Sequence, residues 1–151
     1  MQTAAAEGAE AAEDFLRPQP LVVPVELVHR DVTATVLRAF YTVYSELGFG
    51  FLEAVYSNAL ALLLTEAGLI VRREVPFEIQ FRGQSVGNYR ADLIVDSRVI
   101  VETKTNRQIV LHHTRQLLNY LRASRLEVGL LLNFGDRAEF KRVVNTRSPP
   151  R

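Results

Sequence analysis

Apolar residues recur at helical spacing in the first half of the chain. Over residues 31–47 they fall three and four positions apart, which predicts a helix with one apolar face that Asp31 is placed to cap. Gly48 and Gly50 interrupt this pattern, and a second helix is predicted from about residue 51 to Gly68. Its expected inward-facing residues are Leu52, Val55, Ala59, Leu62 and Leu63.

The second half of the chain has the shorter apolar runs that are typical of strands. Three strands are predicted over residues 69–81, 85–95 and 98–104, the first of them broken or bent at Pro76. A helix is predicted over 111–122, a strand covered on both faces over 126–134, and an edge strand over 139–144. The predicted order is therefore α-α-β-β-β-α-β-β.

The two ends of the chain differ in composition from the part between them. Residues 1–24 are rich in alanine and glutamate and are then broken by three prolines, which predicts a disordered or loosely attached tail. One folded domain is expected over residues 25–146, followed by a C-terminal tail over 147–151. With 151 residues, of which 48% are hydrophobic and 23% charged, the chain suits a single globular domain.

Composition excludes several classes of protein. The chain has no cysteine, so disulfides and cysteine-based zinc sites are excluded. It has no apolar run long enough to span a membrane, and its N-terminus lacks the basic and apolar regions of a secretory signal. We therefore expect a cytoplasmic protein with no membrane partner.

The charges are unevenly spread along the chain. Residues 1–71 carry three basic and nine acidic side chains, whereas residues 72–151 carry fifteen basic and eight acidic ones. The asymmetry indicates a basic surface for contacts with phosphate groups. The alternative is that the arginines only solvate an α/β surface.

Three charged residues interrupt two strands that should otherwise be buried. Asp92 lies in the strand predicted over 85–95, and Glu102 and Lys104 lie in the strand predicted over 98–104, with which it would form a hairpin. Such side chains are rarely placed in buried strands unless they are paired, bound to metal or catalytic. Because the chain has 16 arginines and only two lysines, Lys104 is not a casual surface cation.

The register of this hairpin tests whether the three residues meet. Glu102 and Lys104 are two positions apart and share a face. Asp92 lies opposite Glu102 only if the connection is a three-residue loop over 96–98 or contains a bulge. A two-residue turn would instead pair Asp92 with Val101 and place the carboxylates on opposite faces. We therefore predict the three-residue loop or a bulge.

The spacing D-x9-E-x-K, with a small residue before the aspartate, resembles the PD-(D/E)xK nuclease superfamily. Residues 50–56 spell G-x-x-E-x-x-Y, and over about residues 26–145 the chain resembles the GxxExxY proteins, a family of small proteins with this nuclease fold. The resemblance implies an α/β, restriction-endonuclease-like αβββαβ core. Its mixed central sheet would be flanked by helices, with an extra helix at the N-terminus.

The resemblance also implies catalytic and metal-binding residues. Asp92, Glu102 and Glu53 would hold a divalent metal, and Lys104 would serve the attacking water. Oxygen ligands from these carboxylates, with the backbone carbonyl of Thr103, suit Mg²⁺ or Mn²⁺. The alternative for Glu53 is an acid in the first turn of a helix, stabilised by the helix dipole.

The resemblance also implies residues that bind nucleic acid. Gln116 and Tyr120 match the QxxxY motif of RecB-type nucleases, whose residues face the active site and the nucleic-acid backbone. The candidate nucleic-acid-binding residues are Gln116, Tyr120, His113, Tyr56 and Arg90. His112 is expected to face solvent, because adjacent helical residues point about 100° apart. The alternative is that His113, Gln116 and Tyr120 form only a solvated face of this helix.

The leading interpretation is a metal-dependent enzyme that hydrolyses DNA phosphodiester bonds. The resemblance favours an exonuclease acting on single-stranded DNA or on DNA ends, and a homo-oligomer is left open. A module that keeps the fold and binds nucleic acid or a protein partner, with weak or no catalysis, is the alternative. A third interpretation is an α/β domain with chance motifs, in which Asp92, Glu102 and Lys104 would lie dispersed.

Overall fold

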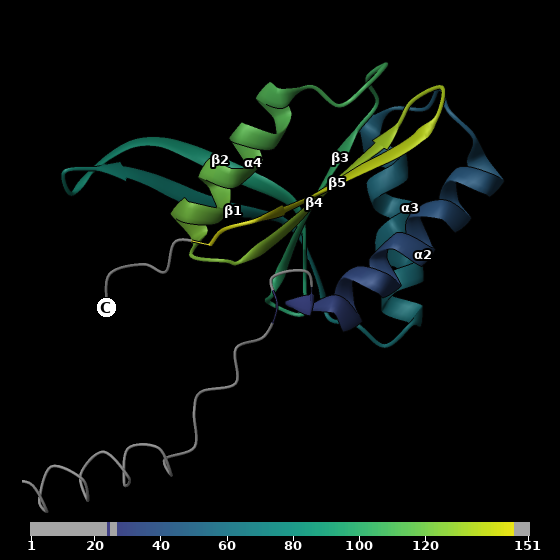
Figure 1. The fold of residues 1–151 in the computed structure, drawn as a ribbon, viewed down its shortest axis with the longest axis horizontal. Helices are drawn as coiled ribbons and strands as arrows, with labels where there is room; N and C mark the ends of the chain where they lie inside the picture. Colours follow the sequence, from purple (N-terminus) through teal and green to yellow (C-terminus); the bar gives the residue numbers. More distant parts are fainter. Residues whose placement is uncertain (1–23, 25–26, 147–151) are drawn as a thin grey trace, which may run out of the picture.

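The computed structural model describes Pro24 and residues 27–146 (Figure 1). The tails predicted over 1–24 and 147–151 lie outside the described residues, Pro24 apart. The elements follow in the predicted order: α2 (Arg30–Leu47), α3 (Glu53–Glu66), β1 (Val71–Phe81), β2 (Gln84–Val95), β3 (Val99–Lys104), α4 (Leu111–Ser124), β4 (Val128–Phe134) and β5 (Ala138–Val144). No helix in the described part of the chain is long and apolar enough to cross a membrane.

The strands form one mixed sheet in the order β1-β2-β3-β4-β5. Neighbouring strands are antiparallel except β3 and β4, which are parallel and are connected by α4. Helices α2 and α3 cover one face of the sheet and α4 covers the other, while the far end of the β1–β2 hairpin extends away from the helices (Figure 1). The predicted α/β core with an additional first helix is confirmed.

The core is built on strands β3 and β4, in which nearly every residue is buried. Every residue of β4 is buried, as expected for a strand covered on both faces. Gly129 lets α4 approach closely, because a Cβ at this position would lie 2.8 Å from the Cδ2 atom of Leu117. The position of α4 over β3 and β4 therefore depends on a residue without a side chain.

Two details of the helices differ from the prediction. The residue before the first turn of α2 is His29, which makes no side-chain cap, and Asp31 lies within that turn. Helix α3 buries Tyr56, Leu60, Ala61 and Leu64, whereas Leu52, Val55 and Leu62 are exposed. Most positions of α3 are apolar, so periodicity alone could not select its inner face.

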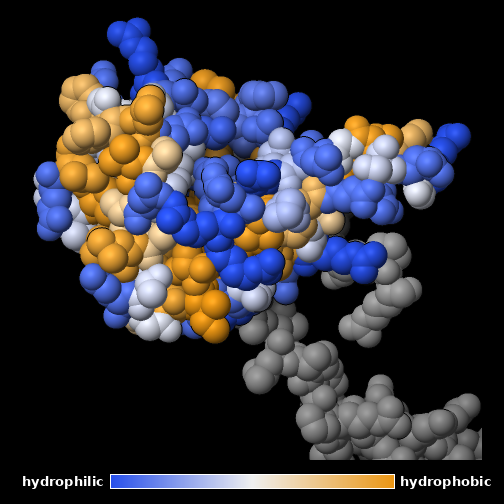
Figure 2. Space-filling view, turned by 180° about the vertical axis from the view of Figure 1, so that it is seen from behind, coloured by the Kyte–Doolittle hydropathy of each residue, from blue (hydrophilic) through white to orange (hydrophobic). Residues whose placement is uncertain are grey.

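The exposed side of this helical layer is correspondingly hydrophobic. Seen from behind, hydrophobic surface gathers on the side of the molecule where α2 and α3 lie (Figure 2). Exposed large hydrophobic residues of these helices and their connection are Tyr41, Leu47, Phe49, Phe51, Leu52, Val55 and Leu62. The exposed face of α3 therefore combines hydrophobic residues with polar ones such as Glu53 and Asn58.

Strand β1 is continuous through Pro76, where a break or bend was predicted. Pro76 is exposed and pairs with Arg90, which is tolerated because β1 is an edge strand. The register shift between β1 and β2 lies further along, between Ile79 and Gln80. Glu74 has a left-handed φ of 48° and, like Asp92, is left out of the regular pairing between Arg73–Leu93 and Val75–Ala91, and both residues line the candidate site.

Candidate metal and nucleic-acid site

The β2–β3 hairpin has the register that the carboxylates require. The last pair before the turn is Val95 with Val99, which leaves residues 96–98 as a three-residue loop. Asp96 and Ser97 both adopt left-handed backbone conformations, with φ of 51° and 56°. The regular pairing ends at Leu93 with Val101, and continuing this register by one position would set Asp92 opposite Glu102. The prediction of a three-residue loop is confirmed.

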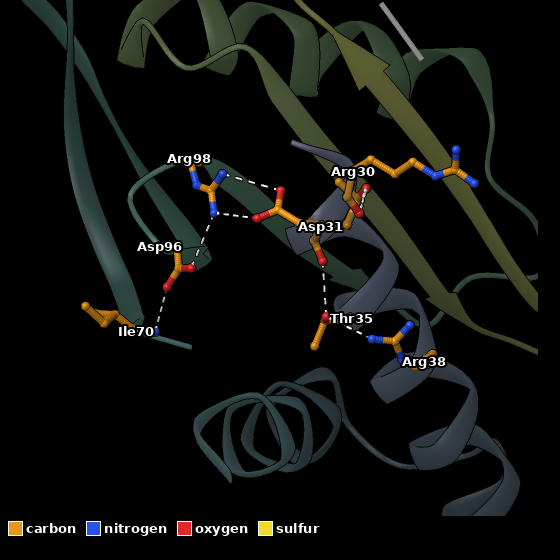
Figure 3. Close-up of polar contacts among 8 residues, drawn as sticks. Arg30, Asp31, Thr35, Arg38, Ile70, Asp96 and Arg98 are labelled. Atoms are coloured by element: carbon orange, nitrogen blue, oxygen red, sulfur yellow. Dashed lines mark hydrogen bonds and ion pairs between the residues drawn. The ribbon is translucent and has the colours of Figure 1, made fainter. Parts of the chain in front are cut away.

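Side-chain contacts anchor this loop to the helical layer (Figure 3). Asp96 accepts a hydrogen bond of 2.8 Å from the backbone N–H of Ile70, and its carboxylate lies 3.6 Å from Arg98. Arg98 also forms an ion pair of 3.0 Å with Asp31, and this hydrogen-bonded pair holds the pKa of Asp31 below its usual range. Asp31 therefore ties the hairpin to α2 instead of capping the helix.

Asp92 is held by the residue that follows Glu102. Its Oδ2 atom accepts hydrogen bonds from the backbone N–H of Thr103 at 2.8 Å and from the Thr103 hydroxyl at 3.1 Å. The Thr103 hydroxyl also lies 2.8 Å from the Ser57 hydroxyl on α3. Since Thr103 donates its hydrogen to Asp92, Ser57 is the donor to Thr103. The Asp92 side chain is thus oriented from both the sheet and α3.

Glu102 is buried, with only 8% of its surface exposed. Its Oε1 atom accepts hydrogen bonds from the Tyr89 hydroxyl and, at 3.4 Å, from the backbone N–H of Asp92. Burial, and secondly the charge of Asp92, raise the pKa of Glu102 to about 8. Without a metal, Glu102 is therefore predominantly protonated at neutral pH.

Tyr89 is a site residue that sequence reasoning missed. It is buried on β2, and burial and the adjacent Glu102 raise the pKa of its hydroxyl. Its ring stacks on Tyr120 of α4 with 3.4 Å between centroids. The signal that could have found it is a tyrosine within a strand three residues before Asp92, because a buried phenol usually has a hydrogen-bond partner.

Lys104 ends β3 on the same face as Glu102 and is half-buried. Burial first, and then the positive charge of Lys104, lower the pKa of His113. The Nδ1 atom of His113 accepts a hydrogen bond of 3.2 Å from the Val110 N–H, and Nε2 lies 3.1 Å from the side-chain nitrogen of Asn106. His113 is therefore engaged with the start of its own helix and with the loop after Lys104.

A cleft of about 500 Å³ lies beside the hairpin, between α3 and the strands. Its lining residues include Glu53, Ser57, Asn58, Arg73, Glu74, Asp92 and Thr103. Glu53 is exposed at the start of α3 and lines the same cleft as Asp92. Within the described residues, however, no three histidine, aspartate or glutamate side chains lie close enough together to hold a metal ion.

The two hairpin carboxylates fit a hard divalent cation. Among the described residues, their hydrogen bonds fall on Oδ2 of Asp92 and Oε1 of Glu102, which leaves Oδ1 and Oε2 for coordination. Oxygen donors of this kind suit magnesium or manganese better than softer metals. The candidate metal site thus offers one oxygen atom from each of the two hairpin carboxylates, and Glu53 lines the cleft of Asp92 without forming a closed three-carboxylate cage in the ranges that the structure describes.

Tyr56 does not offer the nucleic-acid contact expected of it. It is fully buried and stacks on Phe134 with 4.1 Å between ring centroids. Its hydroxyl donates to the carbonyl oxygen of Gly48 at 2.8 Å and accepts from the N–H of Phe51 at 3.2 Å. Tyr56 therefore supports the α2–α3 connection, because α3 turns this side chain into the core and leaves Glu53 outside.

The remaining candidates lie on the surface. Gln116 and Tyr120 are half-buried and line a second cleft, of about 460 Å³, beside α4. The exposed His112 lines the same cleft, and Arg90 is exposed on β2. Tyr120 is connected to Glu102 through the stacked ring of Tyr89. The QxxxY stripe therefore reaches the hairpin indirectly.

This geometry agrees with a comparison of the chain with known families. The model of the PD-(D/E)XK nuclease superfamily matches residues 30–143. The chain belongs to this superfamily. PD-(D/E)XK nucleases are hydrolytic, act on nucleic acids and generally use divalent metals.

More distant comparisons add little to this assignment. No curated protein shows significant similarity to the chain. The crystal structure of SSO0001 is similar at 21% sequence identity and a TM-score of 0.41, covering 100% of this chain and 79% of that chain. A likeness at this level does not inform the site.

Proposed function

We propose that this PD-(D/E)XK protein is a deoxyribonuclease that requires Mg²⁺ or Mn²⁺, and that it belongs to the GxxExxY branch of the superfamily. The observation that carries the proposal is the contact between the two carboxylate residues, in which the Asp92 N–H donates to Glu102 at 3.4 Å. Adjacent carboxylates repel phosphate unless a cation screens them. With Lys104 on the face of Glu102, the pair suits a metal-assisted phosphodiesterase.

Asp92 and Glu102 would hold the cation, together with Glu53 from the cleft and the Thr103 carbonyl. When bound, the cation polarises a phosphoryl oxygen and lowers the pKa of a water molecule. The polypeptide fixes the two carboxylates beforehand, since Thr103 orients Asp92 and Tyr89 orients Glu102. Because the pKa of Glu102 is about 8, Glu102 loses its proton on binding the cation.

Lys104 serves the nucleophile in this proposal. Its ammonium group orients the attacking water and offsets the negative charge that develops on the phosphate, or its neutral amine form takes the proton of that water. Gln116, Tyr120, His113 and Arg90 then contact the nucleic-acid backbone around the site. The likeness of Gln116 and Tyr120 to the QxxxY motif supports exonucleolytic action on single-stranded DNA or DNA ends.

The decisive experiment compares lysine variants on defined substrates. End-labelled single-stranded, duplex and circular DNA are incubated with Mg²⁺, Mn²⁺ or EDTA. We expect the wild-type protein to degrade linear DNA only when metal is present, and we expect Lys104→Ala to lose this activity. Lys141→Ala is the matched control, because Lys141 is the other lysine of the chain and is exposed on β5. Activity of Lys104→Ala equal to that of wild type would refute the proposal.

A catalytically weak binding module is the second candidate. It is favoured by the lack of any group of three metal-ligating side chains within the described residues. Calorimetric titration with Mn²⁺ separates the two functions. Binding that is lost in Glu102→Gln supports the nuclease, whereas a wild-type protein that binds DNA but takes up no Mn²⁺ supports the module.

A further inference from the structure

Arg73 is a cation within the acidic cleft that contains Asp92. Three carboxylates line this cleft, from Glu53, Glu74 and Asp92. Yet within the described residues Arg73 has no carboxylate partner, since the ion pairs there are those of Arg98 with Asp31 and Asp96. Its Nη2 atom donates instead to the Oδ1 atom of Asn58 on α3.

The contact with Asn58 holds the guanidinium without neutralising it. An amide oxygen carries no charge, and a guanidinium has five N–H donors, of which this hydrogen bond uses one. A carboxylate partner would have cancelled the charge that an anionic ligand could otherwise meet. Arg73 is therefore both oriented and available for electrostatic attraction.

The strand register brings Arg73 next to the β2–β3 hairpin. Arg73 pairs with Leu93, one residue from Asp92, and Leu93 belongs to the core on the α2–α3 side of the sheet. Arg72 pairs with Ile94, which belongs to the core on the α4 side. Alternation along β1 therefore sends Arg73 toward the cleft and Arg72 to the opposite face.

We propose that Arg73 binds a phosphate of the nucleic-acid substrate adjacent to the phosphate that is hydrolysed, and that Asn58 is its positioning residue. The inference rests on the proposed nuclease function, because it assigns the cleft of Asp92 to a polyanionic substrate. Guanidinium groups bind phosphate through two parallel hydrogen bonds. Arg73 would thus offset the repulsion between the backbone and the carboxylates beside the site.

The first test measures binding in an inactive background. A fluorescent single-stranded oligonucleotide is titrated with full-length Lys104→Ala protein in Mg²⁺ over a range of salt concentrations. Adding Arg73→Ala should weaken binding about tenfold and reduce the slope of log K against log salt by about 0.7. Adding Arg72→Ala removes the same charge from the opposite face of the sheet, and it should change the DNA affinity and the salt slope much less. Equal effects of the two variants would overturn the proposal.

The second test exploits the neutrality of Asn58. Asn58→Asp supplies a carboxylate that pairs with Arg73, so binding should weaken about as much as in Arg73→Ala, while thermal stability is retained. Asn58→Ala should have a smaller effect. If the Asn58–Arg73 contact is only structural, Asn58→Asp will bind DNA as well as the unmodified background does, and the inference fails.

A double variant distinguishes two ways in which Asn58→Asp could weaken DNA binding. The new carboxylate could neutralise the charge of Arg73, or it could repel the DNA directly. If Asn58→Asp acts through Arg73, its effect should largely disappear in the Arg73→Ala background. An additive effect would show that the introduced carboxylate repels the substrate directly, and it would contradict the positioning role of Asn58.

The two proposals fail separately in these experiments. If Arg73→Ala leaves DNA binding unchanged while DNA degradation still requires Lys104, only the proposed phosphate contact is overturned. A wild-type protein that degrades no DNA, but whose binding still depends on Arg73 and not on Arg72, overturns the nuclease function and keeps the phosphate contact.

Discussion

The Tyr89 hydroxyl donates a hydrogen bond to Oε1 of Glu102 in the interior of the protein. The tyrosine ring is at the same time stacked on Tyr120, so a residue of α4 is packed behind the group that orients this carboxylate. Residues behind metal ligands commonly set ligand orientation and affinity. The Tyr89–Glu102 contact thus links the QxxxY stripe with the candidate metal site.

Tyr89→Phe should weaken metal binding while keeping the ring stack. Loss of the hydroxyl removes the donor that orients Glu102, and we expect Mn²⁺ affinity to fall roughly 10- to 100-fold. Calorimetric titration measures this change. Tyr120→Phe is the matched control, because it removes a hydroxyl from the other ring of the stack and leaves the Glu102 contact in place. Equal losses in both variants would contradict the role given to Tyr89.

The stability of the metal-free protein should fall as pH rises through the neutral range. The pKa of Glu102 is raised from 4.5 to about 8, so between these values the folded protein binds more protons than the unfolded chain. Each pKa unit corresponds to about 1.4 kcal/mol in the free energy of unfolding. Chemical unfolding in EDTA at several pH values measures the trend, and Glu102→Gln should flatten it.

Metal affinity should show the opposite dependence on pH. Because Glu102 releases a proton on binding, Mn²⁺ affinity should rise about tenfold per pH unit below pH 8 and level off above it. Calorimetry in two buffers of different ionisation enthalpy counts the released protons. An affinity that stays constant from about pH 6 to about pH 8 would exclude Glu102 as a ligand that must deprotonate.

Gly135→Ala should destabilise the protein near the end of β3. A Cβ there would lie 2.4 Å from the carbonyl oxygen of Asn106, which accepts a hydrogen bond of 2.8 Å from the buried Asn133. Overpacking of this kind costs about 1–3 kcal/mol in the free energy of unfolding. Denaturant unfolding measures the loss. Gly87→Ala is the control, since a Cβ at Gly87 meets nothing within 4 Å.

The order of the elements was determined by the sequence itself, because the spacing of apolar residues and two glycine breaks are local properties of the chain. The three-residue loop over 96–98 was predicted because the carboxylates had to meet, and the pairing of Val95 with Val99 confirms it. The same holds for β4, whose uninterrupted apolar run predicted burial on both faces. Asp92, Glu102 and Lys104 could be singled out because charge is costly in such strands.

Only the tertiary structure decided which side chains surround these residues. Periodicity could not select the inner face of α3 because most of its positions are apolar. The packed helix buries Tyr56 and leaves Glu53 in the cleft. Tyr89, Asn58 and Arg73 carry no local signal of their roles, since each depends on a partner from another element. Contacts between elements are set by packing of the whole domain, and a pattern along the chain does not contain them.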